Sequence, residues 1–191
     1  VEVREIMKAG RHAVDSNELF TDNLLVPVAD RVGEEGKGFY YILDGLNPER
    51  ILIAAEAIGI GRVALDRAVR YAKERVVFGR PIGQNQAIQH PLAQCWADLE
   101  AANLLTFKAA WLYDNGKSCG AEANAAKLLA SEAGFRAADR AMQTLGGMWY
   151  AQEYHVERYW RESKLYRIAP ITPELILSFI SERVLGLPKS Y

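Results

Sequence analysis

A long stretch of helically spaced apolar residues is the feature that most restricts the fold of this chain. From Phe39 onward, apolar residues recur every three or four positions, and charged residues fall between them. This spacing predicts an amphipathic helix with one buried face. The expected buried face consists of Ile51, Ala54, Ile58, Leu65, Val69 and Ala72, and the expected exposed residues are Arg62, Asp66, Arg70 and Lys73.

Breaks in this pattern set the limits of the helix. Gly45 and Pro48 interrupt its first turns, so we expect either a kink or two abutting helices there. The run Phe78-Gly79-Arg80-Pro81 consists largely of turn-forming residues and predicts the end of the helix.

The rest of the chain repeats the helical pattern. We expect further helices over about residues 85–115, 121–145, 153–164 and 172–186. The second of these has an alanine-rich seam, which favours close helix contacts, and Gly146-Gly147 predicts its end. Thr172-Pro173-Glu174 has the cap residue, proline and carboxylate typical of a helix start. Four long antiparallel helices and one short helix predict an all-α, up-and-down four-helix bundle.

The first 37 residues follow a different pattern. Short apolar runs, such as Leu19-Phe20 and Leu24-Leu25-Val26, alternate with polar turn residues and predict strands. This segment is too short to bury both faces of a sheet, and the chain begins at Val1, so we expect a piece of a longer protein. We therefore divide the chain into residues 1–37, the end of a β unit with its connector, and residues 38–191, a helical bundle domain.

Composition argues against several functional classes. The 191 residues have a formal net charge of -1, which gives no general electrostatic basis for nucleic-acid binding. No apolar run approaches the ~20 residues that span a bilayer. Cys95 and Cys119, like the three histidines, lack the spacing of metal ligands, so we expect no metal site. Two free cysteines and no recognisable signal peptide favour a reducing compartment, and we expect a cytoplasmic protein.

Glu49 is the first candidate for chemistry. A glutamate beside Pro48 is most simply an exposed first-turn residue that the helix dipole stabilises. Alternatively, burial in a cleft would raise its pKa by up to ~3–5 units, into the range where a carboxylate abstracts protons efficiently. The residues alone leave both interpretations open.

Three further segments are suited to an anionic ligand. Arg75, close to Phe78 and Gly79, could clamp a pyrophosphate or simply interact with the dipole at its helix end. The turn from Gln143 to Gly147 offers backbone access to a phosphate or ring, but glycine capping explains it equally well. The amides that follow Thr172 form either an anion site or an ordinary cap.

Taken in order and at this spacing, these segments closely resemble the acyl-CoA dehydrogenase family. The resemblance is carried by Asp30–Phe39, Arg75-x-x-Phe78-Gly79-Arg80-Pro81-Ile82, Gln143-x-x-Gly146-Gly147 and Tyr166-Arg167-Ile168. It extends over essentially the whole chain. The matching region is the end of the family's middle β-domain followed by its C-terminal helical bundle, whereas the N-terminal helical domain and most of the β-domain have no counterpart here.

The resemblance implies oxidation of an acyl-CoA thioester to the 2,3-enoyl-CoA, with FAD as cofactor. In the family, a glutamate removes the α-proton while the β-hydride passes to the flavin, and hydrogen bonds to the thioester carbonyl stabilise the enolate-like transition state. One family position for the base corresponds here to Pro170, which cannot act as one. The other lies in Leu46-Asn47-Pro48-Glu49-Arg50, so the resemblance implies Glu49 as the catalytic base and Asn47 and Arg50 as substrate-binding residues.

The resemblance also implies flavin contacts from more than one subunit. The implied cofactor-binding residues are Arg75, Phe78, Asn85 and Gln86 for a neighbouring subunit's flavin, Gln143, Gly146 and Gly147 for a flavin across the dimer, and Thr172 and Glu174 for the subunit's own flavin. We therefore expect a homodimer or homotetramer. An acyl-CoA is the implied substrate, and an electron-transfer flavoprotein is the implied electron acceptor.

Two departures from the family pattern bear on function. Trp149 stands where the family often has glycine, and Glu174 stands where several members have glutamine. Two alternatives to a dehydrogenase stay open, namely an acyl-CoA oxidase with the same motifs and a non-catalytic helical assembly module that keeps the fold. We also expect this polypeptide alone to bind flavin weakly and to turn over slowly or not at all, because much of the family's flavin-binding region lies outside it.

Overall fold

The computed structural model of the protein describes residues 1–190. These residues divide into two compact units, Val1–Gly45 and a second unit that begins at Leu46. Within the described residues, five α-helices account for most of the secondary structure, together with two short two-stranded sheets. The all-α class is therefore confirmed, whereas the predicted domain boundary after residue 37 stays a prediction.

The first unit contains one antiparallel hairpin. Strand β1 (Glu2–Glu5) pairs with β2 (Asn17–Phe20), so that Glu2 lies opposite Phe20. The sequence predicted the apolar part of β2 but not β1, and residues 24–26 were wrongly predicted as a strand. Every residue of the two strands is exposed, so the hairpin buries neither of its faces. A 3-10 turn, η1 (Val28–Asp30), follows.

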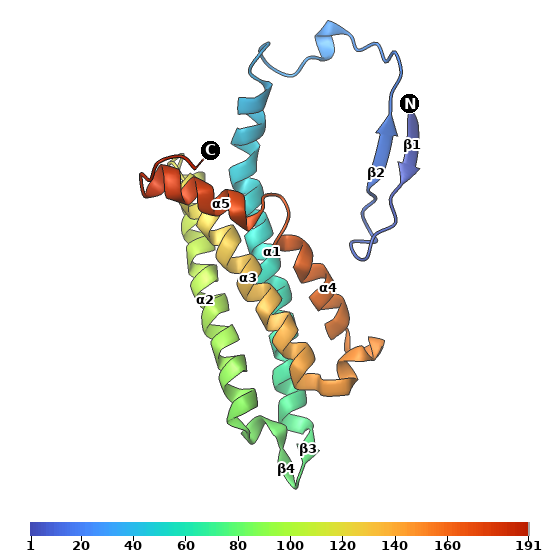
Figure 1. Ribbon diagram of the computed structural model, residues 1–191, viewed down its shortest axis with the longest axis vertical. Helices are drawn as coiled ribbons and strands as arrows, with labels where there is room; N and C mark the ends of the chain where they lie inside the picture. Colours follow the sequence, from blue (N-terminus) through green and yellow to red (C-terminus); the bar gives the residue numbers. More distant parts are fainter. Residues whose placement is uncertain (191) are drawn as a thin grey trace. The chain divides into compact units, whose positions relative to one another are not determined.

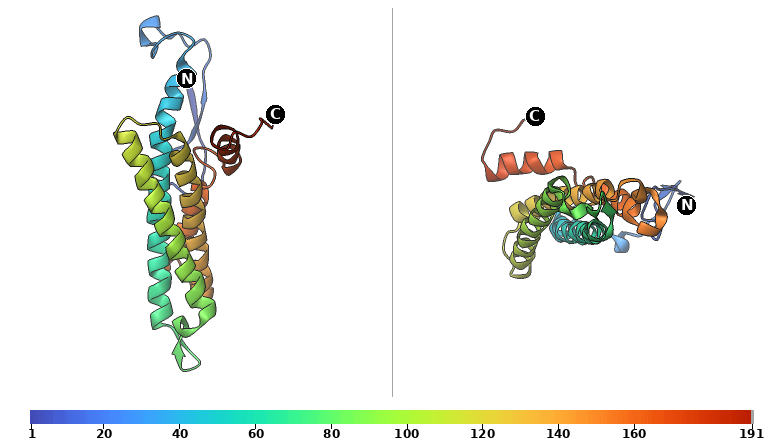
Figure 2. Two further views of the ribbon diagram at one scale, coloured as in Figure 1. Left: turned by 90° about the vertical axis from the view of Figure 1, so that its left-hand side faces the viewer. Right: turned by 90° about the horizontal axis from the view of Figure 1, so that it is seen from below.

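The second unit is an up-and-down helical bundle. It contains the greater part of α1 (Gly38–Glu74), followed by α2 (Gln86–Asp114), α3 (Gly120–Leu145) and α4 (Val156–Tyr166). Successive helices run in opposite directions, and α5 (Pro173–Phe179) lies across the end of the bundle at which α3 begins (Figures 1 and 2). This arrangement confirms the predicted bundle.

A tight hairpin joins α1 to α2. Strand β3 (Val76–Val77) pairs with β4 (Arg80–Pro81), and the two turn residues, Phe78 and Gly79, have φ angles of 52° and 76°. Positive φ at both central positions is the geometry of a type I′ turn, which glycine adopts readily and phenylalanine rarely does. The chain then enters α2 through the 3-10 turn η2 (Ile82–Gln84).

Three helix predictions need correction. Helix α1 is continuous through Pro48, so the expectation of two abutting helices is wrong; a proline removes one backbone donor, and the turns on either side continue the helix. Helix α4 starts later than predicted, because Gln152–Tyr154 forms the 3-10 turn η4 and His155 has a φ of 60°. The last helix is α-helical only to Phe179 and continues as a π-helical turn, η5 (Ile180–Val184).

Small residues bring α1 and α3 into contact. The predicted buried face of α1 is confirmed, since its residues are buried or half-buried and the predicted charged residues are exposed. An ideal Cβ at Gly134 would lie 2.4 Å from the backbone oxygen of Ala57, and one at Gly61 would lie 2.9 Å from the Cα of Gly134. The two backbones therefore touch here with no room for a side chain. The largest core cluster consists of Ala64, Leu65, Ala68, Ala72, Leu92, Cys95, Leu99, Ala133, Ala137, Ala138, Ala141, Leu145 and Val156.

We predict that Gly134→Ala destabilises this chain by about 1–3 kcal/mol, because the added methyl group collides with the backbone of α1. Gly59→Ala is the matched control, since Gly59 is an exposed residue of α1 and an added Cβ there meets no atom within 4 Å. The better helix propensity of alanine then leaves stability unchanged or raises it by up to ~1 kcal/mol. Urea unfolding followed by circular dichroism measures both variants, and equal stability of the two would contradict the close contact.

Candidate functional site

The predicted substrate-binding residues form one polar group on α1. Arg50 is only 9% exposed, and its Nη1 donates a hydrogen bond to Asn47 Oδ1 at 2.9 Å. Burial lowers the pKa of Arg50, and the neighbouring Glu49 carboxylate opposes that shift. The Nε atom of Arg50 is buried and has no hydrogen-bond partner among residues 1–190. Asn47 and Arg50 are thus held together, with part of the guanidinium still unused.

Glu49, the predicted base, is exposed on the same turn of α1. The hollows described below do not include it. Within this chain, Glu49 therefore has the surroundings of an ordinary surface residue of a helix. Its role as a base stays a prediction.

Most residues of the β3–β4 hairpin are exposed, although Val77 and Pro81 are half-buried, and backbone hydrogen bonds order the segment. The N–H of Arg75 donates to the carbonyl of Tyr71 at 2.8 Å, and the carbonyl of Arg75 accepts from the N–H of Ile82 at 2.9 Å. Phe78 is fully exposed at the tip of the hairpin, with a relative exposure of 101%. The hairpin therefore presents an aromatic ring and a cationic side chain outward from the bundle.

Arg80 is a residue that sequence analysis did not single out. Its Nη2 donates to Asn85 Oδ1 at 2.7 Å, and Asn85 Nδ2 donates to the carbonyl of Ile82 at 2.9 Å. These two bonds fix the amide of Asn85 directly before Gln86, which is exposed at the start of α2. The available signal was the hairpin itself, because its turn places Arg80 beside the chain that enters α2.

The third predicted group lies where α3 ends and the 3-10 turn η3 (Gly146–Tyr150) begins. Gly146 has a φ of 58°, and its N–H donates to the carbonyl of Gln143, which confirms the predicted glycine cap. An added Cβ on Gly146 or Gly147 would meet no atom within 4 Å, so the space outside this turn is open. A hollow of about 400 Å³ lies here, lined by Asp139, Met142, Gln143, Gly146 and Trp149.

The fourth group lies at the start of α5. Thr172 Oγ1 accepts a hydrogen bond from the N–H of Leu175 at 3.4 Å, so Thr172 is the cap of this helix, as predicted. Glu174 is exposed, and two hydrogen bonds to its carboxylate lower its pKa. The larger effect comes from its own backbone amide and the smaller one from the Thr172 hydroxyl. An ionised carboxylate here is suited to accept hydrogen bonds from hydroxyl or amide groups rather than to bind a phosphate.

These groups lie at two ends of the bundle. The β3–β4 hairpin and the end of α3 lie at one end, and α5 lies at the other (Figures 1 and 2). The carbonyl of Ile171, next to Thr172, accepts a hydrogen bond from Lys127 of α3 at 2.7 Å. Gln143 lies sixteen positions after Lys127 in α3, which is about 24 Å along a helix. One chain therefore holds two separate sets of predicted residues.

Lys127 is the main polar residue that sequence analysis missed. Its side chain has no exposed surface, and Nζ donates to the carbonyls of Arg167 at 3.2 Å and Ile171 at 2.7 Å. Burial lowers the pKa of Lys127 to about 8. The available signal was its spacing from the buried Ala123 and Ala130, because a lysine on that face of a helix must find polar partners inside the fold.

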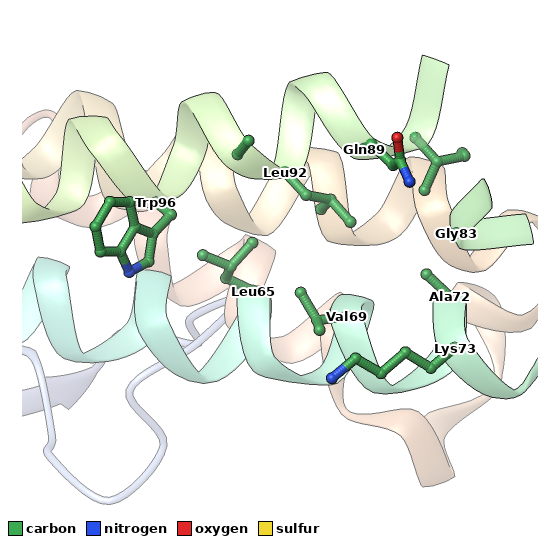
Figure 3. A pocket seen from close by; sticks show the side chains of 10 residues that line it. Leu65, Val69, Ala72, Lys73, Gly83, Gln89, Leu92 and Trp96 are labelled. Atoms are coloured by element: carbon green, nitrogen blue, oxygen red, sulfur yellow. The ribbon is translucent and has the colours of Figure 1, made fainter. Parts of the chain in front are cut away.

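A separate hollow of about 360 Å³ lies between α1 and α2 (Figure 3). Its walls are mainly apolar and include Leu65, Leu92 and the exposed ring of Trp96. Lys73 and Gln89 are the polar side chains among the lining residues. No residue that the sequence predicted for the site lines this hollow, so it offers apolar surface rather than chemistry.

Within residues 1–190, no three His, Cys, Asp or Glu side chains are placed to hold a metal ion together. Across the same residues, no helix has both the length and the apolar character that crossing a membrane requires.

Cys95 and Cys119 are free and buried, and burial raises the pKa of both thiols. A raised pKa reduces the thiolate fraction, which makes both cysteines less reactive.

Comparison with known proteins shows the family. Residues 36–185 match the family profile described as "Acyl-CoA dehydrogenase, C-terminal domain". A curated relative, acyl-CoA dehydrogenase fadE12 of Mycobacterium bovis, is 47% identical over 176 residues, which are 91% of this chain and 45% of the relative. The chain thus spans about half the length of this curated relative.

Solved structures show the same architecture. The structure of the glutaryl-coenzyme A dehydrogenase glutaryl-CoA complex superposes on this chain with a TM-score of 0.93 at 35% sequence identity. The match covers 99% of this chain and 48% of the chain in that structure. A structure of PigA with FAD and proline superposes with a TM-score of 0.90 at 30% identity and covers 97% of this chain and 49% of that one. With its capped helix ends, its glycine turn after α3 and the family match over residues 36–185, this chain belongs to the acyl-CoA dehydrogenase family and contains the family's C-terminal helical domain.

Proposed function

We propose that the full-length protein is an FAD-dependent acyl-CoA dehydrogenase, which converts an acyl-CoA thioester to the 2,3-enoyl-CoA. The family match supports this class of enzyme. One observation carries the assignment of the site: Asn47 and Arg50 form a fixed polar pair directly beside the Glu49 carboxylate, while proline occupies position 170, the other family position for a base.

The residues present fit FAD in their chemistry. The hairpin offers the guanidinium of Arg75, which matches a phosphate in charge and geometry. The turn at Gly146 leaves open space for a ring or phosphate to approach the backbone. At the other end, Glu174 accepts hydrogen bonds from hydroxyl or amide groups, which FAD also carries. When bound, FAD supplies the acceptor for the hydride.

In this proposal Glu49 takes the α-proton of the substrate. A carboxylate base works best when it is covered, because burial raises its pKa towards the working pH. Glu49 is exposed in this chain, which spans about half the length of its curated relative. We propose that other parts of the full-length protein, together with the substrate, cover Glu49.

Arg50 would position the substrate next to this base. Asn47 holds one end of its guanidinium, so the direction of the remaining N–H groups is set before substrate binds. A preset direction limits the conformational freedom that the side chain loses on binding. The acyl-CoA thioester is the substrate that the family match supports.

The separation of the two sets of residues favours a shared cofactor site. The hairpin and the glycine turn lie about 24 Å along α3 from the level of Thr172, so we propose that a second copy of the chain completes each FAD site. A homodimer or homotetramer provides such copies.

An electron-transfer flavoprotein is the proposed electron acceptor. The free, buried cysteines support a reducing compartment such as the cytoplasm.

A non-catalytic assembly module is the second candidate. Pro170 in place of one base, and the exposure of Glu49 in the other base position, favour it. An acyl-CoA oxidase would use the same residues as the dehydrogenase, but its reduced flavin would react rapidly with oxygen. Flavin reduction by substrate and its reversal by oxygen therefore separate the three functions.

We predict that Glu49→Gln in the full-length protein slows flavin bleaching by a panel of acyl-CoAs by roughly 10²–10⁴-fold, because no carboxylate is left to take the α-proton. FAD stays bound, since the change is isosteric. Anaerobic stopped-flow absorbance measures the bleaching. Glu56→Gln is the control, because Glu56 is an exposed carboxylate two turns further along α1, and it keeps the wild-type rate. A wild-type rate for Glu49→Gln would refute the base assignment, and an unreactive wild-type protein would favour the assembly module.

We predict that Arg75→Glu weakens FAD binding to the full-length apoprotein by about 10- to 100-fold, the usual scale for a lost hydrogen bond between charged groups. Arg70→Glu makes the same change of charge on the exposed face of α1 and alters affinity less than about threefold. Fluorescence titration of the apoprotein with FAD measures both. Equal losses in the two variants would show a general charge effect and no phosphate contact at Arg75.

A further inference from the structure

The loop that joins α4 to α5 is held by hydrogen bonds from α3 to its backbone. It consists of residues 167–172, and its first turn continues α4, since the N–H groups of Ile168 and Ala169 both donate to the carbonyl of Leu165 at 2.9 Å. Two other carbonyls of the loop, those of Arg167 and Ile171, accept hydrogen bonds from Lys127. The loop thus turns part of its backbone towards a single cation on α3.

Lys127 is an unusual residue for this position. Its side chain is fully buried, and among residues 1–190 it forms no ion pair. Its two hydrogen-bond acceptors are both backbone carbonyls, one at each end of the loop. Removing a cation from water is unfavourable unless the fold provides such acceptors. A methionine or leucine would fill the same space more simply, so the packing of α3 alone does not require a lysine.

A second set of contacts from α3 holds the side chain of Arg167 at the start of the loop. Arg167 Nε donates to Glu132 Oε1 at 2.7 Å, and the guanidinium lies 5.0 Å from the centre of the Phe135 ring. Lys127, Glu132 and Phe135 lie within about two turns of α3. The start of the loop is therefore held through both the backbone and the side chain of Arg167, whereas at Ile171, directly before Thr172, the bond from α3 is that of Lys127.

We propose that Lys127 is the positioning residue of the FAD site, holding the α4–α5 loop so that Thr172 and Glu174 face the cofactor. This inference rests on the proposed FAD-dependent function. Lys127 acts through the backbone and does not touch the cofactor. Without its Nζ, the two carbonyls lose their inner partner, and the segment 171–174 is free to shift relative to α3.

Lys127 also gives the stability of the folded chain a recognisable dependence on pH. Three charged groups act on its ammonium: Glu132 of α3 and Glu174 of α5 favour the charge, and Arg167 of the loop opposes it. Burial outweighs them and lowers the pKa of Lys127 from its ordinary 10.5 to about 8. A neutral amine still has two N–H donors for two carbonyls, so the loop stays held above pH 8.

The sign of the effect on stability follows from the lower pKa in the folded state. Between about pH 8 and 10.5 the unfolded chain binds the proton more tightly than the native chain does. The contribution of Lys127 to stability therefore rises with pH across this window. Lys127→Met removes this rise, so the stability of wild type relative to the variant increases from pH 8 to pH 10.

The test uses the full-length protein and two readouts, the dissociation constant of FAD and hydrogen–deuterium exchange of the backbone over residues 165–174. Lys127→Met keeps the length of the side chain but removes the donors. It weakens FAD binding roughly tenfold or more and speeds exchange in the loop by a similar factor, because buried carbonyls lose their partner. If Lys127→Met does not fold, Lys127→Gln, which keeps a polar end group, is measured in its place with both readouts.

Leu99→Ala is the matched control, because Leu99 is a buried core residue of α2 that makes no bond to the loop. It lowers the melting temperature and leaves both readouts close to wild type. Wild-type FAD affinity and wild-type loop exchange in the Lys127 variants would overturn the inference, as would losses that Leu99→Ala reproduces at equal melting temperature. If the wild-type protein binds no FAD, the proposed function fails, while loop exchange still decides whether Lys127 holds the loop.

Discussion

The contact between the backbones of α1 and α3 is the constraint on which the rest of the bundle depends. Gly61 and Gly134 have no side chain, and the adjoining positions are mostly alanine, so the two helices approach without intervening atoms. A close approach maximises dispersion contacts and excludes water from the seam. It also restricts both positions to glycine, because an added Cβ at Gly134 would meet the backbone of Ala57, and one at Gly61 would meet the side chain of Leu99 and the backbone of Gly134.

That contact holds the two sets of predicted site residues at opposite ends of one scaffold. α1 carries Arg50 near its beginning and is followed by Arg75 in the hairpin, and α3 carries Lys127 near its beginning and Gln143 near its end. Locked against each other, these helices maintain both sets of residues at a constant separation. This rigidity suits the proposed arrangement in which another copy completes each FAD site, because the relative placement of the sites would then follow from the fold.

The sequence was informative wherever a periodic pattern was long. The buried face of α1, the glycine cap at Gly146 and the threonine cap at Thr172 were all predicted and are confirmed. The start of α4 was not predicted, because it depends on the left-handed conformation of His155, which non-glycine residues seldom adopt. The hairpin strand β1 was also missed, since its four residues include a single apolar one, Val3, and therefore show no apolar alternation.

The parts of the site that depend on distant contacts were less predictable. Lys127 was hidden in an alanine-rich pattern, and its partners are carbonyls about forty residues further along the chain, so only the fold shows why a lysine is there. Arg80 was overlooked for a different reason, because Asn85 is only five residues away but the bond depends on how the hairpin turns. For Glu49 the structure gives its exposure in this chain, and its surroundings in the full-length protein depend on segments that have no counterpart here.

Proton abstraction by Glu49 is the step on which the proposed function depends, and isotope exchange measures it without requiring hydride transfer. The full-length protein is incubated in D₂O with an acyl-CoA analogue that cannot lose a β-hydride, and nuclear magnetic resonance follows the α-hydrogens. We predict that the wild-type protein exchanges them with solvent and that Glu49→Gln does so at the uncatalysed rate. Equal exchange by both proteins would contradict it.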